Sequence, residues 1–406
     1  MHFSATLRLL LAAASSTLLS STFATDTLIG PVTATDIAEF KAAAQKVAPS
    51  TSIANESVSE WAQGISGEST KAFGLVYEVS QDIEILNKMI TFCDTALSIR
   101  NDLNGKGCKI WTDAVDPVWV NCSFMNPIHT GGEQGDPVGH LGNCARQILS
   151  TKSIWAKTIP DHDPQGYGKT YLDRAKTYVK QADFSMDGHI LKSQLTLDNK
   201  DRQYFSMWDP YKSGEAVPWN QQMMFNYGFY NLAISHEILG NAPDRVKRYD
   251  ALVQASVDWF FSTVVSYKDK KGNTAYKWHY NLTLPLSEDS NHGSLDVAGF
   301  SRLYASDRYG ITAAKMEPFA NIVADLIILG GDRYSGLVDG TSTEASRPHS
   351  AMTAFLQSGF LLMAEFKPSV AAAIIGTDLK VGLTNDALDQ LSRAIWVKYR
   401  LNKEKP

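Results

Sequence analysis

Residues 216–236 read AVPWNQQMMFNYGFYNLAISH and contain no formally charged residue when histidine is neutral. A helix without a charged face has to be buried on all sides. The following segment, residues 243–264, reads PDRVKRYDALVQASVDWFFSTV and keeps its charges on one side and its apolar residues on the other. Such a helix is expected to lie half in water. The two segments together predict a helical hairpin with a buried inner helix and an amphipathic outer one.

The same alternation of buried and amphipathic helices recurs elsewhere in the chain. A ring of such hairpins is an (α/α) toroid or incomplete barrel, and we predict this mainly α fold. An irregular α-bundle is the alternative, because the residues show no tight repeat. The further predicted pairs, inner helix first, are residues 137–152 with 170–182, 291–305 with 313–329, and 349–364 with 384–400.

Strand signals are few. Residues 263–282, TVVSYKDKKGNTAYKWHYNL, contain two runs of aromatic and β-branched residues around a Lys-Gly-Asn turn, which predicts a small inserted β-hairpin. Residues 69–101 carry apolar residues three and four apart and begin with a Ser/Thr cap, which predicts helix. Residues 25–60 are rich in Thr, Ser and Ala and are expected to form an N-terminal arm with a short helix over 36–47. We expect residues 61–406 to form one domain.

Residues 1–24 have the pattern of a secretory signal peptide: a basic start, the apolar run LLLAAASSTLL, and small residues ending in STFA. No later segment has the roughly 18 uninterrupted apolar residues of a membrane span. The net charge is −5 and the pI is about 6.0, without a lysine or arginine block. These features argue against nucleic-acid and anionic-membrane partners. We therefore expect a secreted, extracellular monomer.

The cysteines and the sequons fit an exported protein. All four cysteines fall within one short region and lack a CxxC pair, which favours two disulfides over a zinc site and leaves the pairing open. The cysteines are Cys93, Cys108, Cys122 and Cys144. Sequons predict N-glycosylation at Asn55, Asn121 and Asn281.

In a ring of hairpins the starts of all inner helices lie on one face, so polar segments distant in sequence converge there. Their aromatic rings, amides, imidazoles and carboxylates are the groups that line a sugar-binding cleft. The converging segments are NPIHTGGEQGDPVGH (126–140), WDPYKSGEAVPWNQ (208–221), KWHYNLTLPLSEDSNH (277–292) and EASRPHS (344–350).

Purely structural roles compete with function at several of these positions. Asn291 and the serine before it fit an ordinary helix cap, and Trp219 fits the core. Glu288 is harder to explain structurally, because a carboxylate beside Asp289 and just before a buried helix needs a partner or a raised pKa. His292 is the strongest functional candidate of this segment.

The order WNQQ (219–222), WHY (278–280) and EDSNHG (288–293) resembles the alginate-lyase-like (α/α) toroid polysaccharide lyases. It is most similar to the group that cleaves mannuronate or glucuronate polymers, over roughly residues 120–365. The resemblance implies the toroid fold and β-elimination at the C4 oxygen of a uronic acid in alginate, polymannuronate or glucuronan. An acidic polysaccharide is then the partner, and no cofactor is implied.

This chemistry requires neutralisation of the substrate carboxylate before H5 is abstracted, because the carbanion adds charge to an anionic group. Asn220, His292 and a protonated Glu288 suit that task, and Tyr280 is the candidate base. The predicted substrate-binding residues are Trp219, Gln221, Asn291, Arg347, His349, His129 and Tyr211.

The chain departs from the family pattern at two points. Family members often place an Asn-His pair where this chain has Asn220-Gln221, and the histidine here stands at the next helix start. Tyr280 also precedes the sequon at Asn281, where a glycan would crowd a catalytic tyrosine. Tyr304 and Tyr309 are the alternative bases.

Two other functions compete with a lyase. A glycoside hydrolase on the same fold would use two carboxylates, Glu288 or Asp289 with Glu215 or Asp136. A non-catalytic carbohydrate-binding protein would tolerate loss of the ionisable groups. Metal dependence is not expected, because no recognisable ligand spacing occurs on one helix.

Overall fold

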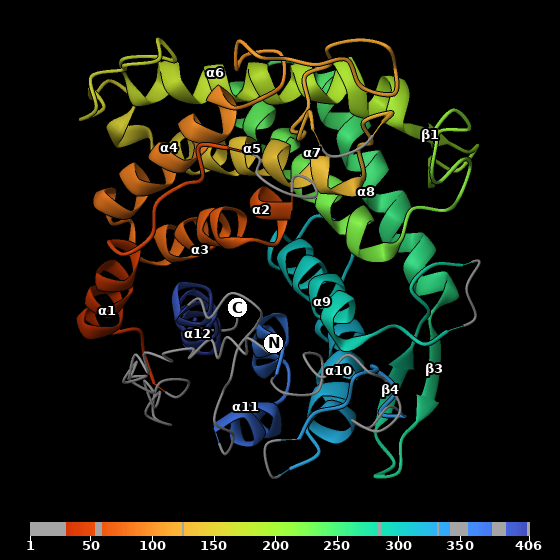
Figure 1. The fold of residues 1–406 in the computed structure, drawn as a ribbon. Coiled ribbons are helices and arrows are strands. Elements are labelled where there is room, and N and C mark those ends of the chain that lie inside the picture. Colours follow the sequence, from red (N-terminus) through yellow and green to blue (C-terminus); the bar gives the residue numbers. More distant parts are fainter. Residues whose placement is uncertain are drawn as a thin grey trace, which may run out of the picture.

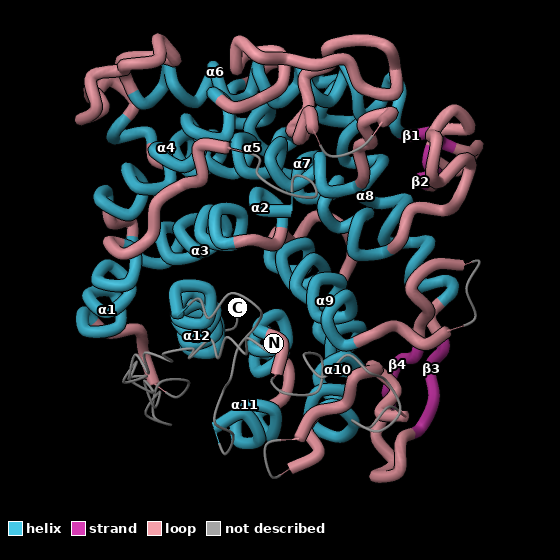
Figure 2. Tube along the Cα trace, in the orientation of Figure 1, coloured by secondary structure: helices cyan, strands magenta, loops and turns pink. Residues whose placement is uncertain are grey.

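The computed structural model describes residues 30–52, 59–123, 126–282, 286–330, 333–341, 356–375 and 387–403. This part of the chain is mainly helical, with two small antiparallel sheets of two strands each (Figures 1 and 2). Its α-helices are α1 (Ala34–Ala44), α2 (Ser59–Ala62), α3 (Ile65–Ser80), α4 (Ile83–Ser98), α5 (Gly135–Ser150), α6 (Tyr171–Ser185), α7 (Trp219–Leu239), α8 (Pro243–Thr263), α9 (Ser290–Ala305), α10 (Ala313–Ile322), α11 (Pro368–Ile375) and α12 (Ala387–Asn402). The strands are β1 (Leu195–Leu197), β2 (Gln203–Phe205), β3 (Val265–Lys268) and β4 (Thr274–Lys277).

The predicted hairpin of a buried and an amphipathic helix is confirmed as α7 and α8, which lie side by side in Figure 1. Nearly all of α7 is buried, and it ends at Gly240, whose φ of +65° is left-handed and suits glycine. Helix α8 begins with Pro243 and buries one face, including Leu252 and Phe260. The charge-free composition of α7 therefore reflects its burial.

The other predicted elements are placed as follows. Helices α5, α6, α9 and α10 match the predicted segments within a few residues, although α10 continues as a π-helical turn, Val323–Ile327. Strands β3 and β4 form the predicted hairpin. The helix predicted over residues 69–101 is two helices, α3 and α4. Helix α3 begins at Ile65, earlier than predicted, and ends before Gln81, which has a φ of +55°. Asp82 then caps the start of α4.

Six buried segments contact one another in series. Helix α3 contacts α5, α5 contacts α7, and α7 contacts α9; helix α9 packs on the 3₁₀ segment Ser358–Glu365, which contacts α12, and α12 returns to α3. Helices α3 and α5 run in the same direction, because Lys71 pairs with Asp136 near their starts and Glu78 pairs with Arg146 near their ends. Their starts therefore lie at the same end of the molecule.

Helix α12 corrects one prediction. Its charges were interpreted as a solvent-facing side, but Arg393 and Lys398 are buried. Arg393 Nη2 lies 2.9 Å from Glu68 Oε2 of α3, and Lys398 Nζ lies 2.7 Å from Asp36 Oδ2 of α1. Helix α12 thus belongs to the inner series, with its charges neutralised inside the protein. Of the predicted inner helix 349–364, residues 349–355 lie outside the described residues, and Ser358–Glu365 is a buried 3₁₀ segment.

The cysteines form one disulfide, Cys108–Cys122. The predicted second disulfide is wrong in this structure, because Cys93 of α4 and Cys144 of α5 are reduced and buried. These two residues pack in the apolar contact between α4 and α5, where cysteine acts as a small hydrophobic side chain.

The structure also bears on the sequons and on membrane insertion. Asn281 is only 4% exposed, so attachment of a glycan there would require the segment to open. Asn121 is partly exposed, and Asn55 lies outside the described residues. In the described part of the chain, no helix is long and apolar enough to cross a membrane.

Candidate active site at the start of helix α9

Helix α9 begins at Ser290 because Asp289 provides its N-cap. The backbone of Asp289 is extended, and its Oδ1 accepts hydrogen bonds from the N–H groups of Asn291 and His292, both at 3.0 Å. An aspartate at this position satisfies two exposed donors and complements the positive end of the helix dipole. The sequence suggested Asn291 and the serine before it as the helix cap. The cap is instead Asp289, and Asn291 donates its backbone N–H to the Asp289 carboxylate.

The second oxygen of the Asp289 carboxylate holds the imidazole of His292. Oδ2 accepts a hydrogen bond from Nδ1 of His292 at 2.6 Å. Burial alone would lower the pKa of His292, but the hydrogen bond and charge of Asp289 outweigh it and raise this pKa. Burial likewise opposes ionisation of Asp289, yet its bonds to His292 lower the pKa of the carboxyl. Because Nδ1 is engaged, Nε2 is the nitrogen left to act on a ligand.

Tyr280 lies against His292, with ring centroids 5.0 Å apart. Its backbone oxygen accepts a hydrogen bond from the N–H of Trp219, which connects the start of α7 to the start of α9. Burial, followed by the negative charges of Glu288 and Glu133, raises the pKa of Tyr280 above its usual value. The phenol is therefore kept protonated, which favours a proton donor over the predicted base.

Glu288 is fully buried, as its awkward position in the sequence suggested. Its Oε1 accepts a hydrogen bond from the N–H of Asp289 at 3.0 Å. Its backbone is held on both sides, since its N–H donates to Trp278 and its carbonyl oxygen accepts from Val338. Glu288 is thus a fixed carboxylate directly behind the Asp289–His292 pair.

Asp296 is a buried acid of this region that the sequence analysis missed. It stands one helical turn after His292 and is fully buried, and its Oδ2 accepts a hydrogen bond from Nε1 of Trp278 at 2.8 Å. Burial raises the pKa of Asp296 to about 7. The available signal was its spacing of four residues from His292, which places both on one helix face.

The first residues of α7 contribute amides. Gln221 Oε1 accepts a hydrogen bond from the N–H of Gly132 at 3.2 Å, and Oδ1 of the buried Asn220 has no hydrogen-bond partner among the described residues. Trp219 is 2% exposed and packs against Trp259 at 5.3 Å. Trp219 therefore packs in the core, which is the structural role weighed for it in the sequence.

A second polar group, around His129, lies on the loops that precede α5 and α7. His129 Nε2 is 3.1 Å from Asp209 Oδ2, and the His129 and Tyr211 rings are 4.8 Å apart. Trp208, in the same loop as Tyr211, is 84% exposed. The ammonium of Lys212 opposes protonation of His292, which places this loop within electrostatic range of the α9 start. Exposed rings beside a histidine suit contact with a pyranose face.

The predicted carboxylate partners of a hydrolase have different surroundings. Asp136 is 2% exposed, and its carboxylate is 2.9 Å from the ammonium of Lys71; burial raises its pKa to about 6. Glu215 is exposed in the loop before α7. The remaining predicted ligands Arg347 and His349 lie outside the described residues.

Glu288, Asp289 and His292 could also ligate a metal ion, which the sequence spacing did not indicate. Each offers one ligand atom, and these atoms lie within 4.8 Å of one another. Three ligands with an open position would be typical of a catalytic metal site. Nδ1 of His292 already donates to Asp289, so Nε2 is the nitrogen of His292 that is open to a cation.

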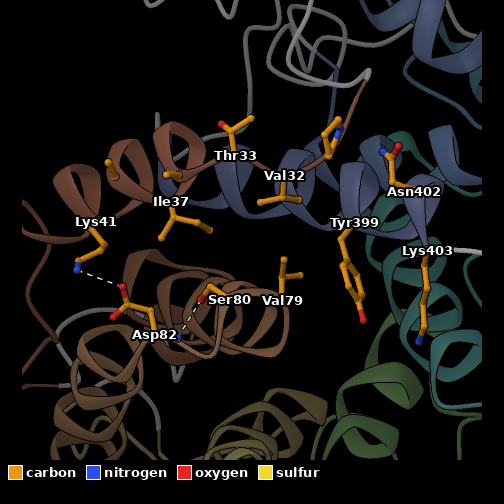
Figure 3. Close-up of a pocket in the computed structure, with 13 residues that line it drawn as sticks. Val32, Thr33, Ile37, Lys41, Val79, Ser80, Asp82, Tyr399, Asn402 and Lys403 are labelled. Carbon is orange, nitrogen blue, oxygen red and sulfur yellow. Dashed lines mark hydrogen bonds and ion pairs between the residues drawn. The ribbon is translucent and has the colours of Figure 1, made fainter.

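An apolar groove lies elsewhere, between α1, the end of α3 and the end of α12 (Figure 3). Its volume is about 670 Å³, and it is lined by apolar side chains such as Val32, Ile37 and Val79. The Lys41–Asp82 ion pair stands at one side. None of its lining residues belongs to the cluster at the start of α9.

Among known proteins, no family model, curated protein or solved structure matches the chain. The resemblance to polysaccharide lyases therefore rests on the three short motifs.

Proposed function

We propose that the protein is a secreted polysaccharide lyase that cleaves a uronic-acid polymer by β-elimination on an (α/α) toroid. The series of contacts from α3 through α12 and back to α3 supports the toroid. The hydrogen bond between His292 and Asp289, with Tyr280 against the imidazole, is the observation that carries the chemistry.

In this mechanism His292 is the base and Tyr280 the acid, a reversal of the role first predicted for the tyrosine. Nε2 of His292 takes the H5 proton, and the electron pair of the C5–H bond becomes the C4=C5 double bond as the C4–O bond breaks. Tyr280 Oη donates its proton to the leaving oxygen. Asp289 stabilises the imidazolium that forms. The raised pKa of Tyr280 suits this task, because the phenol enters the reaction protonated.

The amides at the start of α7 would neutralise the substrate carboxylate. Asn220 and Gln221 are buried and are held by the same helix end, so they can be oriented before substrate binds. Amide N–H groups aimed at a carboxylate stabilise the charge that it gains when H5 leaves. Tyr211 and Trp208 would contact a neighbouring sugar ring.

A glycoside hydrolase remains the second candidate because two carboxylates of this region have opposite pKa shifts. The pKa of Asp296 is raised to about 7 and that of Asp289 is lowered. Such a difference is typical of an acid and base pair. The full burial of Asp296 behind Trp278 makes it the weaker candidate, since substrate would have to reach it.

The deciding experiment follows ultraviolet absorbance of the protein mixed with polymannuronate, polyguluronate or glucuronan, since elimination creates a conjugated double bond and hydrolysis does not. We expect absorbance to rise with one polymer. His292→Asn and Tyr280→Phe should each lower the rate by roughly 10²–10⁴, whereas His162→Asn, on an exposed turn, should leave it unchanged. New saturated reducing ends without absorbance would replace the lyase by the hydrolase.

A further inference from the structure

A partly open cavity between the buried helices lies away from the candidate active site. Its volume is about 230 Å³, and α3, α5, α7, α9 and α12 all contribute to its wall. The wall residues that matter here are Lys71, Glu78, Arg146, Tyr230, Arg302 and Trp396. Arg302 stands ten residues after His292 on α9, about 15 Å along the helix axis. The cavity therefore faces the other end of α9.

Two of the three cations in this wall are already neutralised. Lys71 Nζ donates to Glu68, Asp136 and the carbonyl oxygen of Ala62, each at 2.9 Å, which uses all three of its protons. Arg146 Nη2 donates to Glu78 Oε2 at 2.9 Å. Glu78, the one carboxylate of the wall, is thus occupied by Arg146.

Arg302 is different, because its guanidinium makes no hydrogen bond or ion pair with any described residue. Its flat face lies over the ring of Tyr227, 5.0 Å from the ring centroid. Glu68 and Asp136 act on Arg302 only through their charges, and both are bound by Lys71. Arg302 is half-buried, and its guanidinium carries five N–H donors and a permanent charge that no acceptor among the described residues matches. The cavity is the place from which an acceptor could come.

Two neutral donors line the same cavity. Tyr230 and Trp396 are each 5% exposed, and neither the Tyr230 hydroxyl nor the Trp396 indole N–H donates to a described residue. The cavity has the volume of about eight water molecules. It can therefore hold a small anion with a few waters.

We propose that this cavity binds a small carboxylate anion through a bidentate contact with Arg302, with Tyr230 and Trp396 as further donors. The planar guanidinium fork matches the two oxygens of a carboxylate. Because the bound anion touches α7, α9 and α12 together, it stabilises the folded protein. This site does not depend on the proposed lyase activity.

Thermal unfolding at constant ionic strength tests the proposal, with sodium acetate replacing sodium chloride stepwise. We expect a saturable rise in Tm for the wild type and for Arg333→Gln, a change at an exposed arginine outside the cavity. Arg302→Gln should weaken the apparent affinity for acetate at least tenfold, and Tyr230→Phe should weaken it several-fold. A Tm that does not depend on acetate, or the same saturation in Arg302→Gln as in wild type, would overturn the proposal.

A second variant, Arg302→Lys, tests the proposal even if Arg302→Gln does not fold. Arg302→Lys keeps the positive charge and removes only the fork, so the protein should fold while acetate binding, measured by titration calorimetry, weakens at least tenfold. Unchanged affinity in Arg302→Lys would show that no bidentate contact exists and would likewise overturn the proposal.

Discussion

Nδ1 of His292 lies 2.6 Å from Oδ2 of Asp289, and the other oxygen of the same carboxylate caps the helix on which His292 stands. One side chain therefore sets both the start of α9 and the orientation of the imidazole. The position of the candidate base thus depends on a local rule of helix capping, and the two roles can be separated by mutation.

Asp289→Asn should separate them, because asparagine caps a helix as well as aspartate does but carries no charge. Activity should fall by roughly 10²–10⁴, while stability should fall by no more than about 1 kcal/mol. The pKa of His292 should drop towards its usual value, so the acidic limb of the kcat/KM profile should move to lower pH. An unchanged acidic limb would mean that the pair has only a structural role. Asp289→Ala, which loses the cap as well, is the comparison for stability.

Asp296→Asn should change the pH dependence of stability. The folded-state pKa of Asp296, about 7, exceeds its usual value of 3.8, so its protonated form stabilises the fold at low pH. That contribution is lost as pH rises from about 4 through 7. Asparagine can still accept from Trp278 and never ionises. The variant should match the wild type near pH 4 and exceed it near pH 8, by on the order of a few kcal/mol.

Denaturant unfolding at both pH values checks this prediction, and Asp258→Asn, on the water-facing side of α8, serves as the control. Equal losses of stability at both pH values would show that the carboxylate of Asp296 is required in either protonation state.

Chelators should leave the activity of the protein unchanged. Glu288, Asp289 and His292 lie close enough to hold a cation, but the proton on Nδ1 of His292 already satisfies Asp289. The mechanism proposed above needs Nε2 as a base and uses no metal. Rates on the cleaved polymer, measured after EDTA treatment and again after addition of Zn²⁺, Mn²⁺ or Ca²⁺, should agree. Loss with EDTA and recovery with one cation would assign the cluster to that metal.

The sequence was informative where one physical cause dominates. Helix α7 lacks charges because it is buried, and α8 has a charged face because one side meets water, so both were predictable. Helix α12 was misplaced because pattern alone cannot tell a charge in water from a charge paired inside the protein, as for Arg393 with Glu68. The pairing depends on α3, which lies more than 300 residues earlier in the chain.

The candidate site, too, was predictable from the sequence only in part. His292, Glu288 and Tyr280 were found because polar residues at the start of a buried helix need an explanation. The roles were harder to predict, because the pKa of Tyr280 depends on carboxylates brought in by other segments, including Glu133. Asp296 was missed because its spacing of four residues from His292, the one available signal, was not used, and a single carboxylate in an apolar run is otherwise uninformative about burial.

The absence of a bond between Cys93 and Cys144, where the sequence predicted a second disulfide, can be tested directly. Cys93 and Cys144 are reduced and buried, whereas Cys108 and Cys122 are bonded. Alkylation should label neither thiol in the native protein and both after denaturation without reductant, as read by mass spectrometry of the intact chain. The double change Cys108→Ser and Cys122→Ser should lower the free energy of unfolding by about 3 kcal/mol, because the bond closes a loop of 14 residues. Cys93→Ala should cost less, since it removes one small buried side chain. Absence of label after denaturation would show that Cys93 and Cys144 are oxidised to a second disulfide.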